Sequence, residues 1–98
     1  MSKYKLRVTK DAERDLDDVY SEGFVTWGEK QADRYYDGLL ARFARMCGNP
    51  MLDREVDEIR VGYRRSIYEK HSIFFVIIED TVEVRAVIKR QNITRRLR

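Results

Sequence analysis

A single histidine, His71, and a single cysteine, Cys47, limit the chemistry that this 98-residue chain can perform. A structural zinc site needs several Cys or His ligands, so no such site is predicted. A nucleophile activated by His71 could be Ser66 or Ser72, but Ser72 follows His71 directly, and adjacent strand residues point to opposite faces. We expect His71 to be a turn or strand-start residue that is hydrogen-bonded to the backbone, and Cys47 to be a small apolar residue near a helix end.

Three aspartates, Asp11, Asp15 and Asp18, have the spacing of residues on one side of a helix. Carboxylates placed in this way could bind a cation or act as general acids and bases. Their neighbours in the same segment are also charged, which is typical of a helix face exposed to water. We therefore expect a solvated face, and we predict neither a metal site nor a catalytic residue there.

The five glycines are scattered singly along the chain, so no phosphate-binding loop and no cofactor are predicted. Gly38 falls inside a segment with a helical pattern, where glycine costs about 1 kcal/mol relative to alanine. This cost indicates that another element approaches the helix closely at Gly38.

The periodicity of the apolar residues predicts the elements that must position these side chains. Tyr4, Leu6 and Val8 alternate with polar residues, as in a half-buried strand, and Thr9 can then cap a helix. The helix that follows has one apolar stripe and ends before Gly28. The stripe consists of Ala12, Leu16, Val19, Tyr20, Gly23, Phe24 and Trp27.

A second helix is predicted from about residue 29 to 47, because Gly48 and Pro50 together form a strong stop signal. The short corner between the two helices predicts an antiparallel hairpin. Residues 51–57 lack periodicity and are expected to form a surface loop. Tyr35, Tyr36, Leu39, Leu40, Phe43 and Met46 belong to the apolar stripe of this second helix.

Three strands are predicted after the loop, at residues 59–68, 72–78 and 82–88, with short turns that close hairpins. The middle strand is apolar on both faces and should lie centrally. The prediction is one α+β domain over residues 1–98: a strand, an antiparallel helix hairpin, then a three-stranded antiparallel meander. One face of the sheet should pack on the hairpin, and the other should remain available for contact.

The charge distribution favours an anionic partner for the second half of the chain. Residues 1–58 contain 10 Lys and Arg against 13 Asp and Glu, whereas residues 59–98 contain 10 against only 4. A basic end can meet nucleic acid or an acidic protein surface. No signal peptide and no apolar run of membrane-spanning length are visible, so a cytoplasmic protein is expected.

Several short motifs, taken in order, resemble those of a known family. They are Glu58-Ile59-Arg60-Val61-Gly62-Tyr63-Arg64-Arg65, His71-Ser72-Ile73-Phe74-Phe75-Val76, the Trp27-Gly28 corner and the Asn49-Pro50 break. Their order and spacing resemble the ParE toxins of bacterial toxin–antitoxin modules, within the RelE/ParE superfamily. The resemblance implies the same fold, inhibition of DNA gyrase by binding without chemistry, and neutralisation by a ParD-like antitoxin in a hetero-oligomer. A C-terminal segment of that antitoxin would fold on the toxin.

Two sets of contact residues are predicted with this resemblance. The candidates for binding the target are the basic residues near the C-terminus: Arg85, Lys89, Arg90, Arg95 and Arg96. The candidates for binding the antitoxin are Phe24, Trp27, Tyr35, Tyr36, Arg64 and Arg65. Most of the aromatic residues in this second set are also expected in the core, and Trp27 is expected to pack at the hairpin corner.

Two other functions stay open at this stage. A RelE-like ribosome-dependent mRNA endonuclease would use cations and a proton-transfer group around the scissile phosphate. Arg64 and Arg90 could supply two of these cations, but Ser66 and Ser72 occupy two further basic positions, and no tyrosine follows Tyr68. The other alternative is a nucleic-acid-binding module, for which the aromatic residues fall on buried stripes and not on a basic face.

Overall fold

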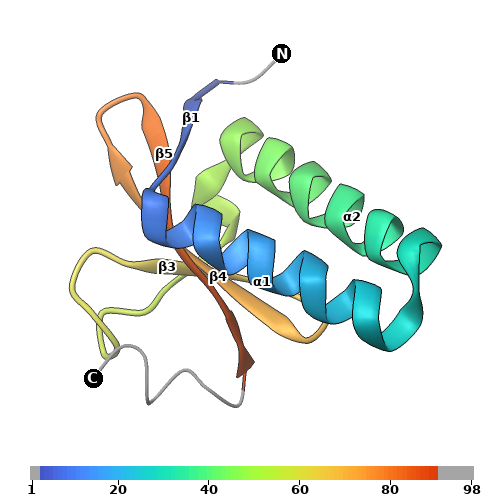
Figure 1. Ribbon diagram of the computed structural model, residues 1–98. Coiled ribbons are helices and arrows are strands. Elements are labelled where there is room, and N and C mark those ends of the chain that lie inside the picture. The colour runs from blue at the N-terminus through green and yellow to red at the C-terminus, as the bar shows by residue number, and fades with distance from the viewer. Residues whose placement is uncertain (1–2, 91–98) are drawn as a thin grey trace.

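The computed structural model, which describes residues 3–90, places a helix hairpin against one face of a five-stranded sheet (Figure 1). In chain order the elements are β1 (Lys5–Val8), α1 (Lys10–Trp27), α2 (Glu29–Gly48), the 3₁₀ helix η1 (Pro50–Leu52), β2 (Arg54–Glu55), β3 (Arg64–Tyr68), β4 (His71–Ile78) and β5 (Thr81–Lys89). The predicted α+β order of a strand, two helices and a three-stranded meander is confirmed.

Local sequence signals fix the ends of the two helices. The Thr9 hydroxyl accepts a hydrogen bond from the Ala12 N–H at 3.2 Å, so the predicted cap of α1 is confirmed. Gly28 has a φ of 90°, which costs glycine little, and α2 begins directly after it. The second helix includes Gly48, one residue beyond the predicted end. Neither helix in the described part of the chain is both long and apolar enough to cross a membrane.

The sheet has the order β1-β5-β4-β3-β2, with β1 parallel to β5 and all other neighbours antiparallel. The apolar strand β4 lies between β3 and β5, as predicted. In the pairing of β1 with β5, Leu6 lies opposite Val82 and Val8 opposite Val84. The first and last strands described are therefore neighbours, and the helix hairpin is the connection that brings them together.

An aspartate of α1 completes the edge of β5. Strand β1 pairs only with residues 81–84 of β5, because the chain turns into α1 after Val8. Further along β5, the Val87 N–H donates to Asp15 Oδ2 at 3.0 Å. The Asp15 side chain is buried, so the expectation that Asp11, Asp15 and Asp18 form one solvated face is wrong for Asp15. Its carboxylate supplies an acceptor where the strand has no neighbour to supply one.

The main core lies between the hairpin and the sheet. Leu39 and Phe43 of α2 and Ile73 and Phe75 of β4 are almost completely buried there. Gly38 lies directly against β3: a Cβ atom at this position would be 1.8 Å from the Tyr68 hydroxyl oxygen. The predicted close approach at Gly38 is confirmed, and the absence of a side chain there makes room for the Tyr68 hydroxyl.

The opposite face of the sheet carries a second, smaller core, so the prediction of an open face is wrong. The segment between β2 and β3 crosses this face and covers it. The apolar side chains in this second cluster are Val56, Tyr63, Phe74, Val76, Ala86 and Ile88.

The covering segment also corrects two predicted boundaries. The strand expected at 59–68 begins only at Arg64, because residues 59–63 form turns. The Ile59 N–H donates to the Val56 carbonyl, and Gly62 has a φ of 86°. The loop expected at 51–57 contains η1 and β2, and Val56 within it is fully buried. The alternation of apolar and polar residues at 59–63 imitates a strand, and only the packing of Val56 and Tyr63 decides otherwise.

The second half of α1 is more exposed than its apolar stripe predicts. The buried residues of α1 all lie in its first two turns, whereas Phe24 is 47% and Trp27 66% exposed. Trp27 therefore does not fill the hairpin corner, contrary to its expected packing role. The apolar stripe continues past the part of the helix that the sheet covers, so the last residues of the stripe do not pack against the sheet.

Replacing Asp15 with alanine should destabilise the protein by about 1–3 kcal/mol, because the Val87 N–H is then buried without an acceptor. For a domain of this size the loss corresponds to a Tm lower by at least about 4 °C, measurable by thermal or urea unfolding. Asp18→Ala, at an exposed position of the same helix, is the matched control and should change stability by less than about 0.5 kcal/mol. Equal losses in both variants would contradict the edge-capping role of Asp15.

Candidate partner-binding surfaces

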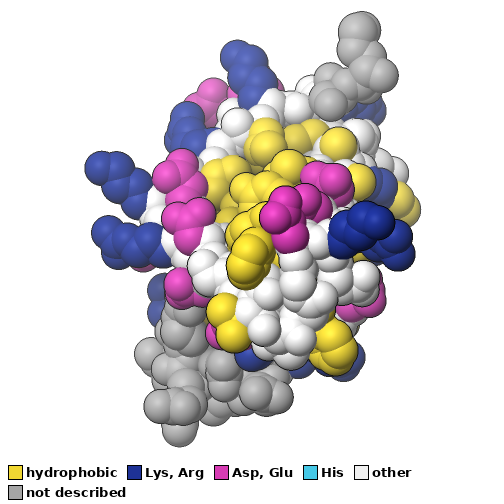
Figure 2. Space-filling view, turned by 45° about the vertical axis from the view of Figure 1, so that its right-hand side comes forward, with side chains coloured by type: hydrophobic (Ala, Val, Ile, Leu, Met, Phe, Trp, Pro, Cys, Tyr) yellow, Lys and Arg dark blue, Asp and Glu magenta, His cyan; other side chains and the backbone are white. Residues whose placement is uncertain are grey.

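An apolar groove of about 390 Å³ lies between β1 and the two helices. We call it the helix groove; it is lined by Leu6, Val8, Glu13, Leu16, Asp17, Tyr36, Leu40 and Phe43. Leu6 is 46% and Leu40 43% exposed, so the groove leaves large aliphatic side chains in contact with water. Figure 2 shows hydrophobic side chains gathered on the helical side of the molecule, with acidic side chains next to them.

Aromatic residues extend this surface along the hairpin. The Tyr20 ring contacts Tyr36 edge to face, with centroids 5.8 Å apart, and lies 6.3 Å from the Phe24 ring. The Tyr20 hydroxyl donates to Asp33 at 2.6 Å, which ties α1 to α2 beside the groove. Phe24 and Tyr36, both predicted to bind a partner, therefore belong to the same face as the helix groove.

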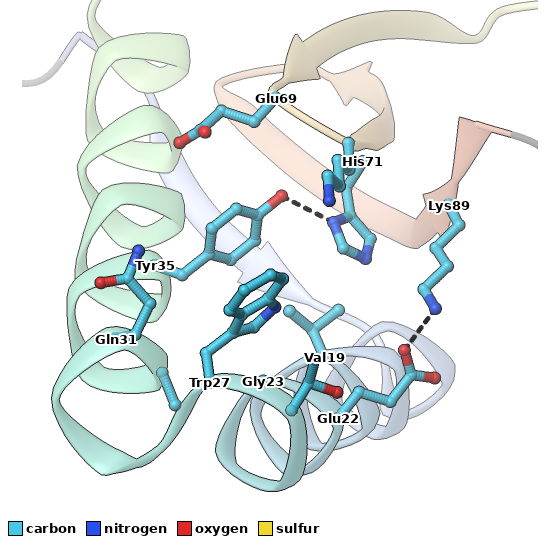
Figure 3. A pocket seen from close by; sticks show the side chains of 12 residues that line it. Val19, Glu22, Gly23, Trp27, Gln31, Tyr35, Glu69, His71 and Lys89 are labelled. Atoms are coloured by element: carbon cyan, nitrogen blue, oxygen red, sulfur yellow. Dashed lines mark hydrogen bonds and ion pairs between the residues drawn. The ribbon is translucent and has the colours of Figure 1, made fainter.

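A second hollow, also of about 390 Å³, lies at the other side of the hairpin, near its corner (Figure 3). Four parts of the chain meet there: the end of α1, the start of α2, the β3–β4 turn and the end of β5. We call it the corner pocket; it is lined by Val19, Glu22, Gly23, Thr26, Trp27, Gln31, Ala32, Tyr35, Glu69, Lys70, His71 and Lys89. It shares no residue with the helix groove.

A hydrogen bond of 2.7 Å joins the Tyr35 hydroxyl to His71 Nδ1 in the corner pocket (Figure 3). Burial lowers the pKa of His71, and the nearby positive charge of Lys89 lowers it further, while Glu22 opposes the shift. Burial also raises the pKa of Tyr35 to about 12. Both groups are therefore uncharged at neutral pH. The prediction of His71 at a strand start is confirmed, but its imidazole forms a hydrogen bond with a tyrosine side chain and not with the backbone.

Charged and aromatic side chains surround this pair. Lys89 Nζ lies 2.5 Å from Glu22 Oε2, an ion pair that ties the end of β5 to α1 (Figure 3). Lys70 Nζ lies 5.8 Å from the centroid of the Trp27 ring, within the range of a cation–π contact. Trp27 and Tyr35, two residues predicted to bind the antitoxin, thus belong to the corner pocket.

The structure does not gather the predicted target-binding residues on one surface. Arg85 lies on the face of the sheet opposite the helices, where its guanidinium packs over Tyr63, whereas Lys89 lies on the helix side and pairs with Glu22. Arg90 is exposed directly after β5. Arg95 and Arg96 lie outside the described residues.

Arg85 is held by neighbours within the sheet. A register shift between Phe74 and Phe75 places it in an irregular part of β5, and its Nε donates to Glu83 Oε1 at 2.6 Å. Arg7 of β1 donates to the other carboxylate oxygen of Glu83 at 3.1 Å. Burial opposes ionisation of Glu83, but the two arginines outweigh it and hold the pKa of its carboxyl below the usual range. Arg85 therefore contributes to an internal ion-pair cluster.

The two arginines predicted to bind the antitoxin are also separated. Arg64 donates to the Asp53 carbonyl and to Glu55 Oε1, and its side chain is largely buried. Arg65, the next residue of β3, points to the opposite face of the sheet because side chains alternate along a strand. Arg64 therefore holds the β2 segment in place.

Two of the positions considered for RNA cleavage, Arg64 and Ser66, are held by contacts within the protein. Ser66 is buried and accepts hydrogen bonds from Arg42 and Arg45 of α2. Arg45 also makes a bidentate ion pair with Asp53, with both N–O distances below 3 Å. Within residues 3–90, no cluster of three or more His, Cys, Asp or Glu side chains is arranged to hold a metal ion.

Of the residues that line the helix groove, sequence reasoning named only Tyr36 as a partner-binding candidate and missed the others. Leu6 and Leu40 were assigned to buried stripes, and Glu13 and Asp17 were treated as part of a solvated helix face. Their positions in apolar and acidic patterns are those of ordinary amphipathic elements. Only the juxtaposition of β1 with both helices shows that the stripe continues into an unfilled groove.

The fold resembles that of solved toxin–antitoxin proteins. It superimposes on a chain of the structure titled "Chromosomal ParDE TA system from P. aeruginosa" with a TM-score of 0.79, at 17% identity, covering 89% of this chain and 96% of that chain. It also matches the toxin–antitoxin complex RelBE2 from Mycobacterium tuberculosis with a TM-score of 0.63, at 20% identity and coverages of 92% and 94%. The hairpin on a mixed sheet is thus the fold of the RelE/ParE class.

Sequence comparison then assigns the family. Residues 6–94 match the family model described as "ParE toxin of type II toxin-antitoxin system, parDE". The chain is 32% identical over 88 residues to Toxin ParE1 of Mycobacterium tuberculosis (strain H37Rv), covering 88% of this chain and 90% of the relative. It is 30% identical over 69 residues to Toxin ParE1 of Caulobacter vibrioides, with coverages of 70% and 72%. This chain belongs to the ParE family of toxins from type II toxin–antitoxin systems.

The pKa of His71 should respond in opposite directions to the two halves of the Lys89–Glu22 pair. Lys89→Met removes a positive charge and leaves Glu22 unpaired, so the pKa of His71 should rise; Glu22→Gln leaves Lys89 unpaired, so it should fall. An NMR titration of the imidazole measures this directly, because the chain has one histidine.

The matched control is Lys5→Met, which removes another paired lysine at the opposite end of β5 and should leave the His71 titration unchanged. Shifts of the same sign in Lys89→Met and Glu22→Gln would contradict the electrostatic assignment.

Proposed function

We propose that this ParE-family toxin inhibits DNA gyrase by binding it, without chemistry of its own, and that a ParD-like antitoxin neutralises the toxin. Membership of the ParE family supports the proposal as a whole. The observation that carries the antitoxin part is the helix groove, where large apolar side chains remain exposed between three elements. The antitoxin segment would fold in this groove as an amphipathic helix.

The chemistry of the helix groove fits such a segment. Leu6 and Leu40 lie along it nearly half exposed, and the Tyr20, Phe24 and Tyr36 rings continue its apolar surface along the hairpin. A helix binds a groove of this kind through residues at positions i, i+3, i+4 and i+7. Binding of the antitoxin helix would bury the apolar side chains of the groove and so remove from water the apolar surface that the sheet does not cover.

The charges beside the groove indicate which side chains the antitoxin helix should carry. Glu13 and Asp17 of α1 line the groove, and Arg64, once a candidate partner for antitoxin acids, is already paired with Glu55. Opposite charges across an interface select the partner and its orientation. The antitoxin helix should therefore present lysine or arginine toward α1.

An exposed strand edge lies next to the groove. Strand β1 is at one end of the sheet and has only β5 as a neighbour. An extended peptide can add to such an edge through backbone hydrogen bonds. The residues of the antitoxin that flank its helix could pair with β1 and thereby fix the direction in which the helix enters the groove.

Inhibition without chemistry is consistent with the roles found for the possible catalytic residues. In RelE-like cleavage, cations must be available to the scissile phosphate. Here Arg64 is bound to Glu55 and the Asp53 carbonyl, and Ser66 is bound by two arginines of α2. For contact with gyrase, the candidates remain Arg85, Lys89 and Arg90, together with Arg95 and Arg96; Arg90 is the most accessible of those described.

Purified toxin should convert supercoiled plasmid to linear DNA in the presence of gyrase, and it should leave mRNA intact in a ribosome-programmed cleavage assay. Arg90→Ala should weaken the gyrase effect by about tenfold, since a hydrogen bond to a charged group contributes about 1.5–3 kcal/mol. Arg14→Ala, at an exposed arginine of α1, is the control and should retain full potency. Cut mRNA with unaffected gyrase would replace this proposal by the RelE-like nuclease.

Leu40→Glu should reduce antitoxin affinity by about 10- to 100-fold, because burying a leucine contributes about 1.5–3 kcal/mol and the new carboxylate would stand in an apolar groove beside Glu13 and Asp17. Calorimetry with the cognate ParD-like antitoxin measures this, and growth arrest by Leu40→Glu should persist when the antitoxin is co-expressed. Leu52→Glu is the matched control: Leu52 is 69% exposed but lies outside the groove, so its affinity should be unchanged. Equal affinity of both variants would exclude the groove as the antitoxin site.

A further inference from the structure

Lys89, a candidate for contact with gyrase, is the one lining residue of the corner pocket that the proposed function uses, and the composition of the pocket is that of a small-molecule site. Its volume of about 390 Å³ is at the lower end of the range found for ligand pockets. Such pockets combine apolar and aromatic walls with a few convergent polar groups. Here Val19, Gly23 and Ala32 form apolar walls, and the Tyr35–His71 pair is the polar group at the sheet side.

Small residues keep the pocket open. The helices approach each other closely beside it: a Cβ atom at Gly23 would lie 3.6 Å from the Ala32 Cβ. Neither residue has a side chain long enough to enter the hollow, so the space between Trp27, Tyr35 and His71 remains unfilled (Figure 3).

The aromatic wall is accessible to a ligand. Trp27 lines the pocket and is 66% exposed, although a tryptophan usually buries most of its ring when it has a packing role. Figure 3 shows its indole rising between Tyr35 and Val19. An exposed indole face of this kind offers a stacking surface for another flat ring.

Two acids and two lysines line the pocket, Glu22, Glu69, Lys70 and Lys89, and Lys70 is the group that can pair with an anion on that ring. Within residues 3–90, Lys70 has no carboxylate within ion-pair distance, and its ammonium group lies over the Trp27 ring. Lys89 is the second ammonium group, held in place by Glu22. His71 adds a ring nitrogen beyond the one that contacts Tyr35. An anion that reached Lys70 would therefore meet a cation that forms no ion pair within the described residues.

We propose that the corner pocket binds a flat aromatic ring that carries one anionic group, with the ring stacked on Trp27 and the anion paired with Lys70. A nucleoside monophosphate and an aromatic carboxylate both have this chemistry. The site is separate from the helix groove, so a ligand could occupy it while the antitoxin is bound.

The test is an NMR titration, because the only tryptophan and the only histidine of the chain both line the pocket. The probes are AMP, benzoate, adenosine and ribose 5-phosphate. AMP or benzoate should shift the Trp27 indole N–H and His71 ring signals saturably, whereas adenosine, without the charge, and ribose 5-phosphate, without an aromatic ring, should bind at least about tenfold more weakly. Tighter binding of AMP would identify a nucleotide, and tighter binding of benzoate an aromatic carboxylate.

Variants assign the two contacts separately. Lys70→Met should weaken binding of the anionic probe at least about tenfold, and Trp27→Leu, read from the His71 signals, should weaken it similarly. Lys5→Met, which removes a lysine far from the pocket, is the control and should bind as the unmodified chain does.

No saturable shift with AMP or benzoate, or shifts that persist unchanged in Lys70→Met and Trp27→Leu, would overturn the proposal. Equal binding of ribose 5-phosphate and AMP would also overturn it, because the ring would then contribute nothing. None of these outcomes affects the gyrase and antitoxin experiments, whose variants lie outside the pocket.

Discussion

The backbone of β5 must find hydrogen-bond partners along both of its edges, and the rest of the structure depends on how this is done. Strand β4 satisfies one edge, whereas β1 covers only the first part of the other. The chain then turns into α1, whose Asp15 accepts the Val87 N–H. The connection between β1 and β5 thus fixes the position of α1 over the sheet, and α2 follows because the corner at Gly28 is so short.

This arrangement leaves the hairpin only partly covered, and both candidate binding sites result from it. Toward β1, the apolar stripes of the helices continue into the helix groove, where Leu40 remains exposed. Near the hairpin corner, the small residues Gly23 and Ala32 leave space between Trp27 and His71. The two hollows differ in chemistry: one is apolar with acids beside it and fits a peptide helix, and the other combines aromatic rings with lysines and glutamates.

Features that depend on neighbouring residues in the chain could be predicted. The Thr9 cap, the Gly28 corner and the apolar β4 were all recognised, because capping, turn formation and periodicity act over a few residues. The close approach at Gly38 was also predicted, because glycine is unfavourable inside a helix and its presence there indicates a neighbouring element. Predictions failed where the local pattern indicated one structure but burial depended on residues distant in the chain, as at residues 59–63 and at Trp27.

The sequence by itself determined the class of fold, the order of the elements and, through its motifs, the toxin family. Only the tertiary structure decided that Asp15 is buried, that Arg85 and Lys89 lie on opposite faces of the sheet, and that Leu6 and Leu40 meet in an open groove. These facts depend on contacts between residues as much as 76 positions apart, such as Arg7 with Glu83. Periodicity along the chain carries no information about such pairs, because it shows which side of an element is apolar but not what that side meets.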